Sequence, residues 1–155
     1  MTQATGAEAA RDTEFFRDLP QQYIERLEAL GRPIRFERDQ IIFREGEPHG
    51  SLYLILTGSV SLEVTAPGRT LRVLTINKGE EFGWSSILPS HGKHFQARAL
   101  SNVQALVFDA AGISQVCEAE PEFGYALMKR LLVSVSDRLD AVRVQLLDLY
   151  SAGEK

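Results

Sequence analysis

Three histidines are the first candidates for chemistry in this sequence, because imidazole binds transition metals and titrates near neutral pH. They are His49, His91 and His94. A metal site on a β-barrel needs two closely spaced histidines and a carboxylate on one strand, with another histidine on a later strand. His91 and His94 flank Gly92-Lys93 in an expected loop, and no suitable carboxylate follows them. We therefore expect no metal site.

Motifs of covalent and phosphoryl-transfer catalysis are missing from the sequence. It has no nucleophile elbow, no Walker loop and no His-Glu-x-x-His pattern. Cys117 is its single cysteine, which excludes an intramolecular disulfide and a zinc site built on several thiolates. We expect that the protein is not an enzyme.

Charge and hydropathy indicate which classes of partner the protein can bind. The chain has 155 residues, with 17 Lys and Arg against 21 Asp and Glu and a net charge of −4. Nucleic-acid binding requires clustered positive charge, so we expect none. No apolar run approaches the roughly 18 residues of a membrane-spanning helix. The first 12 residues lack the basic stretch and apolar core of a signal peptide, so a cytoplasmic location is the default expectation.

The N-terminal part is expected to consist of a disordered segment and short helices. Residues 1–12 are small and polar, and we expect them to be disordered. Phe15 and Phe16 are expected to lie on a helix that docks on the core. An amphipathic helix then opens at Leu19-Pro20 and ends at Gly31 and Pro33. Its apolar stripe comprises Tyr23, Ile24, Leu27 and Leu30.

The middle of the chain, from Ile34 to Phe108, has the pattern of short strands separated by turns. The candidate strands are Gln40–Phe43, Leu52–Leu56, Val60–Val64, Leu71–Ile76, Phe95–Leu100 and Val103–Phe108. The turn signals are Gly46-Glu47-Pro48, Thr57-Gly58, Pro67-Gly68 and Asn77-Lys78-Gly79. Many short strands at near-even spacing predict a sandwich or barrel of the jelly-roll kind.

The C-terminal part changes to a helical period. A short segment, Ala111–Ala119, leads to Pro121, which suits the first position of a helix. A helix over Pro121–Tyr150 would be about 45 Å long. Its apolar residues are spaced alternately by four and three: Met128, Leu132, Val135, Leu139, Val142, Leu146 and Leu149. This heptad seam favours a homodimer, and the alternative is that it packs on the chain's own core.

Four stretches of the chain occur in an order that resembles a known family. They are Ile42-Phe43-Arg44-Glu45-Gly46-Glu47, Leu52-Tyr53-Leu54-Ile55-Leu56-Thr57-Gly58-Ser59-Val60, Asn77-Lys78-Gly79-Glu80-Glu81-Phe82-Gly83 and Asp137-Arg138-Leu139. They resemble a strand with its glycine turn, the central hairpin, the approach to the phosphate-binding cassette and the start of the dimerising helix. The family is the cyclic-nucleotide-binding domain of the catabolite activator and FNR-type regulators.

The resemblance extends from about Leu19 to Leu149 and implies a mainly β fold with flanking helices. That fold is a double-stranded β-helix, or jelly roll, followed by a long C-terminal helix. We expect residues 13–155 to form one such domain, including the helix at about 121–150. The family's transcription factors carry a helix-turn-helix after this helix. Because this chain stops at Lys155, we expect a stand-alone form without direct DNA binding.

The resemblance also places a phosphate-binding cassette, in which the chain departs from the family. In members that bind cAMP or cGMP, a Glu after the cassette glycine holds the ribose hydroxyl, and a later Arg pairs with the cyclic phosphate. Here Trp84 follows Gly83, and Lys93 stands at the place of the Arg. Lysine cannot make a bidentate contact. Losing one or two charged hydrogen bonds of about 1.5–3 kcal/mol would weaken binding by roughly ten- to ten-thousand-fold.

Other groups near the cassette could still hold a nucleotide-like anion such as cAMP or cGMP. A helix that starts near Gly83 would offer backbone N–H groups, and glycine allows a phosphate to approach closely. The candidate ligand-binding residues are Phe82, Gly83, Trp84, Ser85, Ser86, Lys93 and His94. On the long helix, Val142 and Arg143 match the place where the family contacts the purine, and a guanidinium can stack on a base.

Each candidate also has a structural interpretation. Trp84 could belong to the core, Ser85 and Ser86 could cap their helix, and Arg143 could lie on a solvated face. His94 could likewise be a surface histidine.

Two functional hypotheses therefore lead. The first is a sensor domain that binds a nucleotide-like anion and signals through the long helix to a protein partner. The second is a ligand-free dimerisation or interaction module in which Trp84 fills the pocket. A third, a cupin-like metalloenzyme, would require stoichiometric metal.

Overall fold

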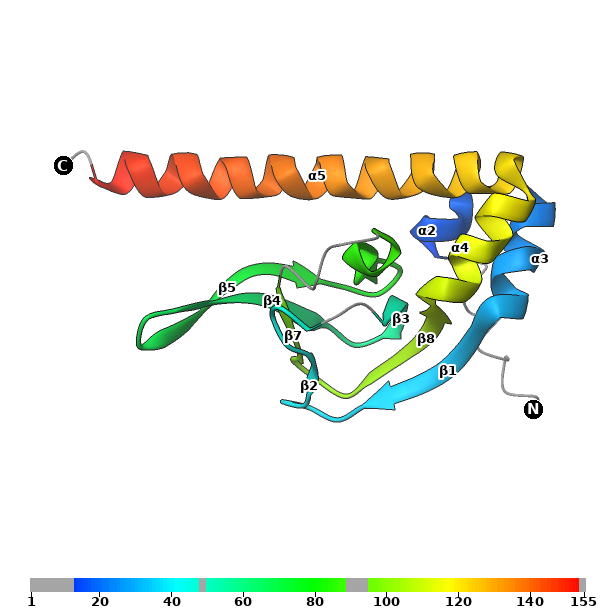
Figure 1. The fold of residues 1–155 in the computed structure, drawn as a ribbon. Coiled ribbons are helices and arrows are strands. Elements are labelled where there is room, and N and C mark those ends of the chain that lie inside the picture. Colours follow the sequence, from blue (N-terminus) through cyan, green and yellow to red (C-terminus); the bar gives the residue numbers. More distant parts are fainter. Residues whose placement is uncertain (1–12, 48–49, 89–94, 154–155) are drawn as a thin grey trace.

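The computed structural model describes residues 13–47, 50–88 and 95–153, which form two antiparallel sheets and a long helix (Figure 1). One sheet contains β1 (Gly31–Phe36), β8 (Val103–Asp109), β3 (Ser51–Thr57) and β6 (Glu81–Phe82), in that order. The other contains β2 (Ile41–Phe43), β7 (Gln96–Ala99), β4 (Val60–Ala66) and β5 (Arg69–Ile76). The predicted jelly-roll class is confirmed.

The helices lie at the two ends of the sequence, apart from one short turn. They are α2 (Glu14–Arg17), α3 (Gln21–Leu30), the 3-10 helix η1 (Trp84–Ile87), α4 (Ala110–Ala119) and α5 (Pro121–Gly153). As predicted, α2 buries Phe15 and Phe16, and α3 ends at Leu30. The helix predicted to end at Tyr150 continues to Gly153. Residues 1–12, predicted to be disordered, lie outside the described residues.

Two strands were not predicted from the sequence. Pro33 had been interpreted only as a helix terminator, but it lies within β1, at the edge of its sheet. An edge position explains this, because proline cannot donate a ladder hydrogen bond and is accepted in edge strands. The second missed strand, β6, has only two residues, which is too short for any periodicity to be visible.

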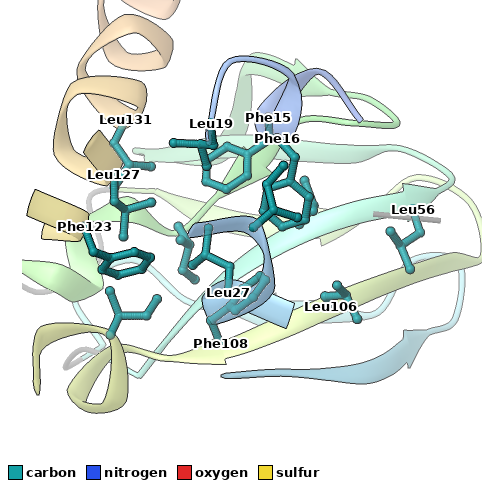
Figure 2. Packing of buried hydrophobic residues seen from close by; sticks show 14 residues of the cluster. Phe15, Phe16, Leu19, Leu27, Leu56, Leu106, Phe108, Phe123, Leu127 and Leu131 are labelled. Atoms are coloured by element: carbon teal, nitrogen blue, oxygen red, sulfur yellow. The ribbon is translucent and has the colours of Figure 1, made fainter. Parts of the chain in front are cut away.

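The first sheet separates two hydrophobic cores, because alternate residues of its central strands point to opposite faces. On β3, Leu54 belongs to the core under the helices, whereas Ile55 belongs to the core between the sheets. The helical side of the first core includes Phe16, Leu27 and Phe123 (Figure 2). The helices are thus fastened to the outside of the jelly roll.

The long helix α5 has one buried face and one exposed face. Phe123, Leu127 and Leu131 lie in the first core with at most 6% exposure (Figure 2). Further along, α5 runs alongside the β4–β5 hairpin, and its C-terminal end extends past the tip of that hairpin (Figure 1). From residue 139 to residue 153, every residue is exposed except the half-buried Val142. We call residues 121–138 the docked half of α5 and residues 139–153 its projecting half.

Candidate functional site

The cassette predicted from the glycines is built by the segment from Gly79 to Ile87. Gly79 turns the chain with a φ of +87° and donates to the Ile55 carbonyl at 2.8 Å. After β6, Gly83 adopts a φ of +88°, a left-handed conformation that favours glycine. η1 then starts at Trp84, where the sequence predicted a short helix. The two predicted glycine turns and the short helix after them are therefore present, whereas phosphate binding by this segment stays a prediction.

The side chains that follow Gly83 point largely inwards. Ser85 and Ser86 are each 5% exposed, and neither caps η1, whose N-cap is Gly83. The Ser86 hydroxyl has no hydrogen-bond partner among the described residues. Trp84 is half-buried and packs against the first core. Its position agrees with part of the structural interpretation, in which the indole contributes to packing.

A small cavity of about 20 Å³ lies beside this segment. It is lined by Phe43, Leu62, Gly83, Trp84, Ser85 and Phe95. A volume of this size holds about one water molecule. Lys93 and His94, like His49 and His91, lie outside the described residues, so their contribution to the site stays a prediction.

The predicted purine contacts lie on the projecting half of α5. Val142 is half-buried, whereas the Arg143 side chain is 69% exposed. Arg143 pairs with Asp140 one turn earlier, at 3.0 Å between Nη2 and Oδ1. A nearby residue, Gln145, donates to the Val73 carbonyl of β5 at 3.0 Å. Within the single chain, Arg143 therefore faces solvent, and its contact with a base stays a prediction.

The predicted dimer seam lies on a face of α5 that the rest of the chain leaves largely uncovered. Leu132, Leu139 and Leu149 are 67%, 69% and 72% exposed. Met128 and Leu146 are exposed at 39% and 52%, and Val135 is half-buried. The alternative that the seam packs on the chain's own core is therefore wrong for these leucines. A different face of the helix does that packing.

A buried ion pair between the cassette segment and α5 was not identified from the sequence. Arg138 Nη2 lies 3.4 Å from Glu81 Oε1, and the same nitrogen donates to the Glu81 main-chain carbonyl. The exposed fractions of the two side chains are 12% and 2%. One signal was available, because Leu131, Arg138 and Gln145 are seven residues apart and so share the body-facing side of the helix.

A second cavity, of about 190 Å³, lies next to this ion pair. Its lining includes Glu14, Glu80, Glu81, Arg130, Asp137 and Arg138. Burial raises the pKa of the Glu80 carboxyl, and the nearby Glu81 and Glu14 raise it further, against the Asn77 N–H and Arg138, which lower it. The cavity wall is thus crowded with carboxylates.

The described part of the structure shows neither a metal-binding cluster nor a membrane-spanning helix. It contains no group of three or more His, Cys, Asp or Glu side chains placed to hold a metal ion. Cys117 is a free thiol, and burial raises its pKa. Among the described helices, none is both long enough and apolar enough to cross a bilayer.

The jelly roll followed by a long helix is the fold of the family that the sequence resembles, and comparison with known proteins agrees. The family model of the cyclic nucleotide-binding domain matches residues 33–120. The match covers most of both sheets and the whole cassette. The chain belongs to the cyclic nucleotide-binding domain family.

Individual relatives fit the same assignment. The chain is 30% identical over 101 residues to a CRP-like cAMP-activated global transcriptional regulator of Mycobacterium tuberculosis. That alignment covers 64% of this chain and 45% of the relative, so the chain spans about half the length of the curated protein it matches.

Two solved structures show the same fold. A cyclic nucleotide-binding domain from Methylobacillus flagellatus has a TM-score of 0.78 at 21% identity, over 92% of this chain and 80% of the other. The c-di-GMP-responsive global regulator of Xanthomonas campestris has a TM-score of 0.75 at 21% identity, over 84% and 65%.

Proposed function

We propose that this chain is a sensor domain that binds a nucleotide-like anion at the Gly83 cassette and signals through α5 to a protein partner. The family match over residues 33–120 carries the proposal, because it includes the whole cassette. The left-handed Gly83, the buried Ser85 and the buried hydroxyl of Ser86, which has no partner among the described residues, support it. Such groups suit an anion, since a glycine allows close approach and a buried hydroxyl needs a hydrogen-bond partner.

The ligand is proposed to be cAMP, cGMP or a related nucleotide bound with altered affinity. Trp84 and Lys93 stand where cAMP-binding members carry Glu and Arg, so the ribose and phosphate contacts must be made differently. The relatives themselves differ in the ligands that their names give, since one is cAMP-activated and another responds to c-di-GMP. A cyclic dinucleotide therefore belongs among the ligands to be tested.

The proposed signal passes through α5 and a homodimer built on its seam. The exposed leucines of the seam support this step, since a sustained heptad seam is typical of paired helices. A ligand shifts the helix only if it contacts two states of the domain differently. The cassette and α5 are the elements that such a ligand would contact together.

The second candidate is a ligand-free dimerisation module on the same fold. The partial burial of Trp84 against the first core supports it, because an indole that fills the pocket leaves less room for a base. In that case α5 would mediate assembly without a small-molecule signal.

Thermal unfolding separates the two candidates. Purified protein is titrated with cAMP, cGMP, c-di-GMP and, as the acyclic control, AMP. A ligand at one hundred times its dissociation constant adds about 2.7 kcal/mol to the free energy of unfolding. We expect a rise in Tm with one cyclic nucleotide and a smaller rise in Ser85→Ala and Lys93→Ala variants. If none changes the Tm at millimolar concentration, the sensor is rejected in favour of the assembly module.

A further inference from the structure

We propose that the 190 Å³ cavity between β5, β6 and α5 is a second binding site, which takes an α-amino acid with a positively charged side chain. The site goes beyond the proposed function, because it is separate from the Gly83 cassette. The small cavity beside Gly83 and this larger one share no lining residue. Neither the ligand of this site nor its test therefore depends on a nucleotide.

The first reason is the charge of the cavity wall. Four carboxylates and two guanidiniums line the cavity in the described structure: Glu14, Glu80, Glu81, Asp137, Arg130 and Arg138. Arg130 already has three acceptors, since it donates to the main-chain carbonyls of residues 14 and 15 and to the Ser134 hydroxyl. Burial raises the pKa of the Glu80 carboxyl, so its charged form would gain from a bound cation. The cavity therefore favours a ligand with net positive charge and disfavours a phosphate.

The second reason is a pair of buried atoms that lack hydrogen bonds. The Glu81 side chain is 2% exposed, and its Oε1 has no hydrogen-bond partner among the described residues. Arg138 Nη1 has none in the same part of the chain. Both side chains line the cavity, and the other guanidinium nitrogen, Nη2, lies 3.4 Å from Oε1. A buried acceptor and a buried donor thus lie next to each other, and each is costly to leave unpaired.

This pair of atoms determines the chemical class of the ligand. The Glu81 oxygen requires an N–H donor, the Arg138 nitrogen requires an oxygen acceptor, and the two positions are neighbours. An α-amino acid carries its ammonium and its carboxylate on one carbon, so it supplies both groups close together. The α-ammonium would bind Glu81, and the α-carboxylate would bind Arg138.

The remaining lining determines the side chain of the amino acid. Leu74 and Ile76 of β5 offer apolar surface to an alkyl chain. Glu14 of α2 and Asp137 of α5 are exposed carboxylates, which suit a second cationic group at the end of that chain. A volume of 190 Å³ holds on the order of ten water molecules, and lysine has a similar number of non-hydrogen atoms.

The same carboxylates do not form a metal site. In residues 13–47, 50–88 and 95–153, no group of three or more His, Cys, Asp or Glu side chains is placed to hold a metal ion. The carboxylates come from α2, β6, α5 and the turn before β6, and they are distributed along the cavity wall. This distribution suits a ligand with several charged groups better than it suits a single ion.

Isothermal titration calorimetry tests the ligand class, at about 0.15 M salt so that weak surface attraction is screened. Three probes are compared: lysine, norleucine, which lacks the side-chain ammonium, and cadaverine, which lacks the carboxylate. We expect lysine to bind, and the other two to bind at least about tenfold more weakly, since each loses a charged hydrogen bond. If lysine does not bind at about 10 mM, the site is overturned. If norleucine or cadaverine binds as tightly as lysine, the amino-acid class is wrong.

Variants test whether lysine binds in this cavity. Glu81→Gln keeps the shape of the side chain but removes its charge, so it should weaken lysine binding at least about tenfold. Glu63→Gln is the matched control. Glu63 is also a buried glutamate paired with an arginine, but it lines neither of the two cavities. The lysine affinity of this control should equal that of wild type.

Urea unfolding first establishes that each variant is folded. If Glu81→Gln does not fold, Asp137→Asn takes its place, because this exposed side chain lines the same cavity. Asp137→Asn should weaken lysine binding several-fold. Wild-type lysine affinity in the folded cavity variant would overturn the site, and so would an equal loss of affinity in Glu63→Gln. None of these outcomes depends on whether a cyclic nucleotide binds the protein.

Discussion

The two halves of α5 have similar compositions but very different environments. In the docked half, Leu127 and Leu131 are 0% and 6% exposed, whereas Leu139 and Leu149 in the projecting half are 69% and 72% exposed. The residue type is the same, so the difference arises from what each leucine faces. Burial of a leucine side chain contributes about 1.5–3 kcal/mol. The docked half thus stabilises the monomer, while the projecting half is available for a partner.

The largest expected effect comes from truncating one leucine in each half. Leu127→Ala should lower the free energy of unfolding by about 2–5 kcal/mol, because it leaves a cavity in the first core. Leu139→Ala should have little effect on the monomer. Urea unfolding at several protein concentrations measures both. A loss for Leu139→Ala that equals the loss for Leu127→Ala at every concentration would erase the distinction between the halves.

A smaller but more specific effect is expected on assembly. The double substitution Leu132→Glu and Leu139→Glu should weaken the proposed dimer by roughly a hundredfold or more, since several leucine contacts are lost across the seam. Sedimentation equilibrium measures the dissociation constant, and circular dichroism verifies the fold. Leu147→Glu is the control, because Leu147 is 56% exposed but does not belong to the seam. If the control and the seam variant dissociate equally, the seam is not the interface.

The smallest expected effect lies where the two halves of α5 meet. Glu80 lines the cavity there, next to the Glu81–Arg138 ion pair. Burial raises the pKa of this carboxyl, so its ionisation disfavours the folded state. For a raised pKa, the stabilisation is present below the unfolded-state pKa and is lost as the pH rises through the folded-state pKa. Glu80→Gln should therefore raise the Tm modestly at pH 7.

That gain should shrink as the pH falls and the wild-type carboxyl becomes protonated. Thermal unfolding between pH 4 and pH 7.5 checks this, at pH values chosen to span the range of carboxyl titration. Glu25→Gln, on an exposed position of α3, is the control and should show no such trend. A gain from Glu80→Gln that is equal at every pH would show that the carboxylate charge is not its cause.

Much of the fold could be predicted from the sequence because its signals are local. Period-two strands, glycine turns and the heptad seam each depend on neighbouring residues, and the jelly roll and α5 follow from them. The cassette backbone was predicted for the same reason, since Gly79 and Gly83 mark their own turns. The strand β6 was missed because two residues have no detectable period.

The parts of the site that could not be predicted depend on contacts between distant segments. Nothing near Glu81 in the sequence shows that its carboxylate is buried against an arginine 57 residues away. Whether Trp84 packs in the core or stacks on a ligand likewise depends on which side chains from distant segments pack against its indole ring. The roles proposed for Lys93, His94 and Arg143 remain predictions, because no contact in the described structure tests them.

The edge strand β1 has a consequence for how copies of the protein meet. Its outer side could in principle add a further strand, which is the usual beginning of sheet-to-sheet aggregation. Pro33 lacks an N–H to offer such a strand, and the exposed Arg32 and Arg35 on either side would repel a second copy of the same edge. The strand thus disfavours the growth of fibrils through sheet edges. At high protein concentration, we therefore expect copies to associate through their helices before they associate through their sheets.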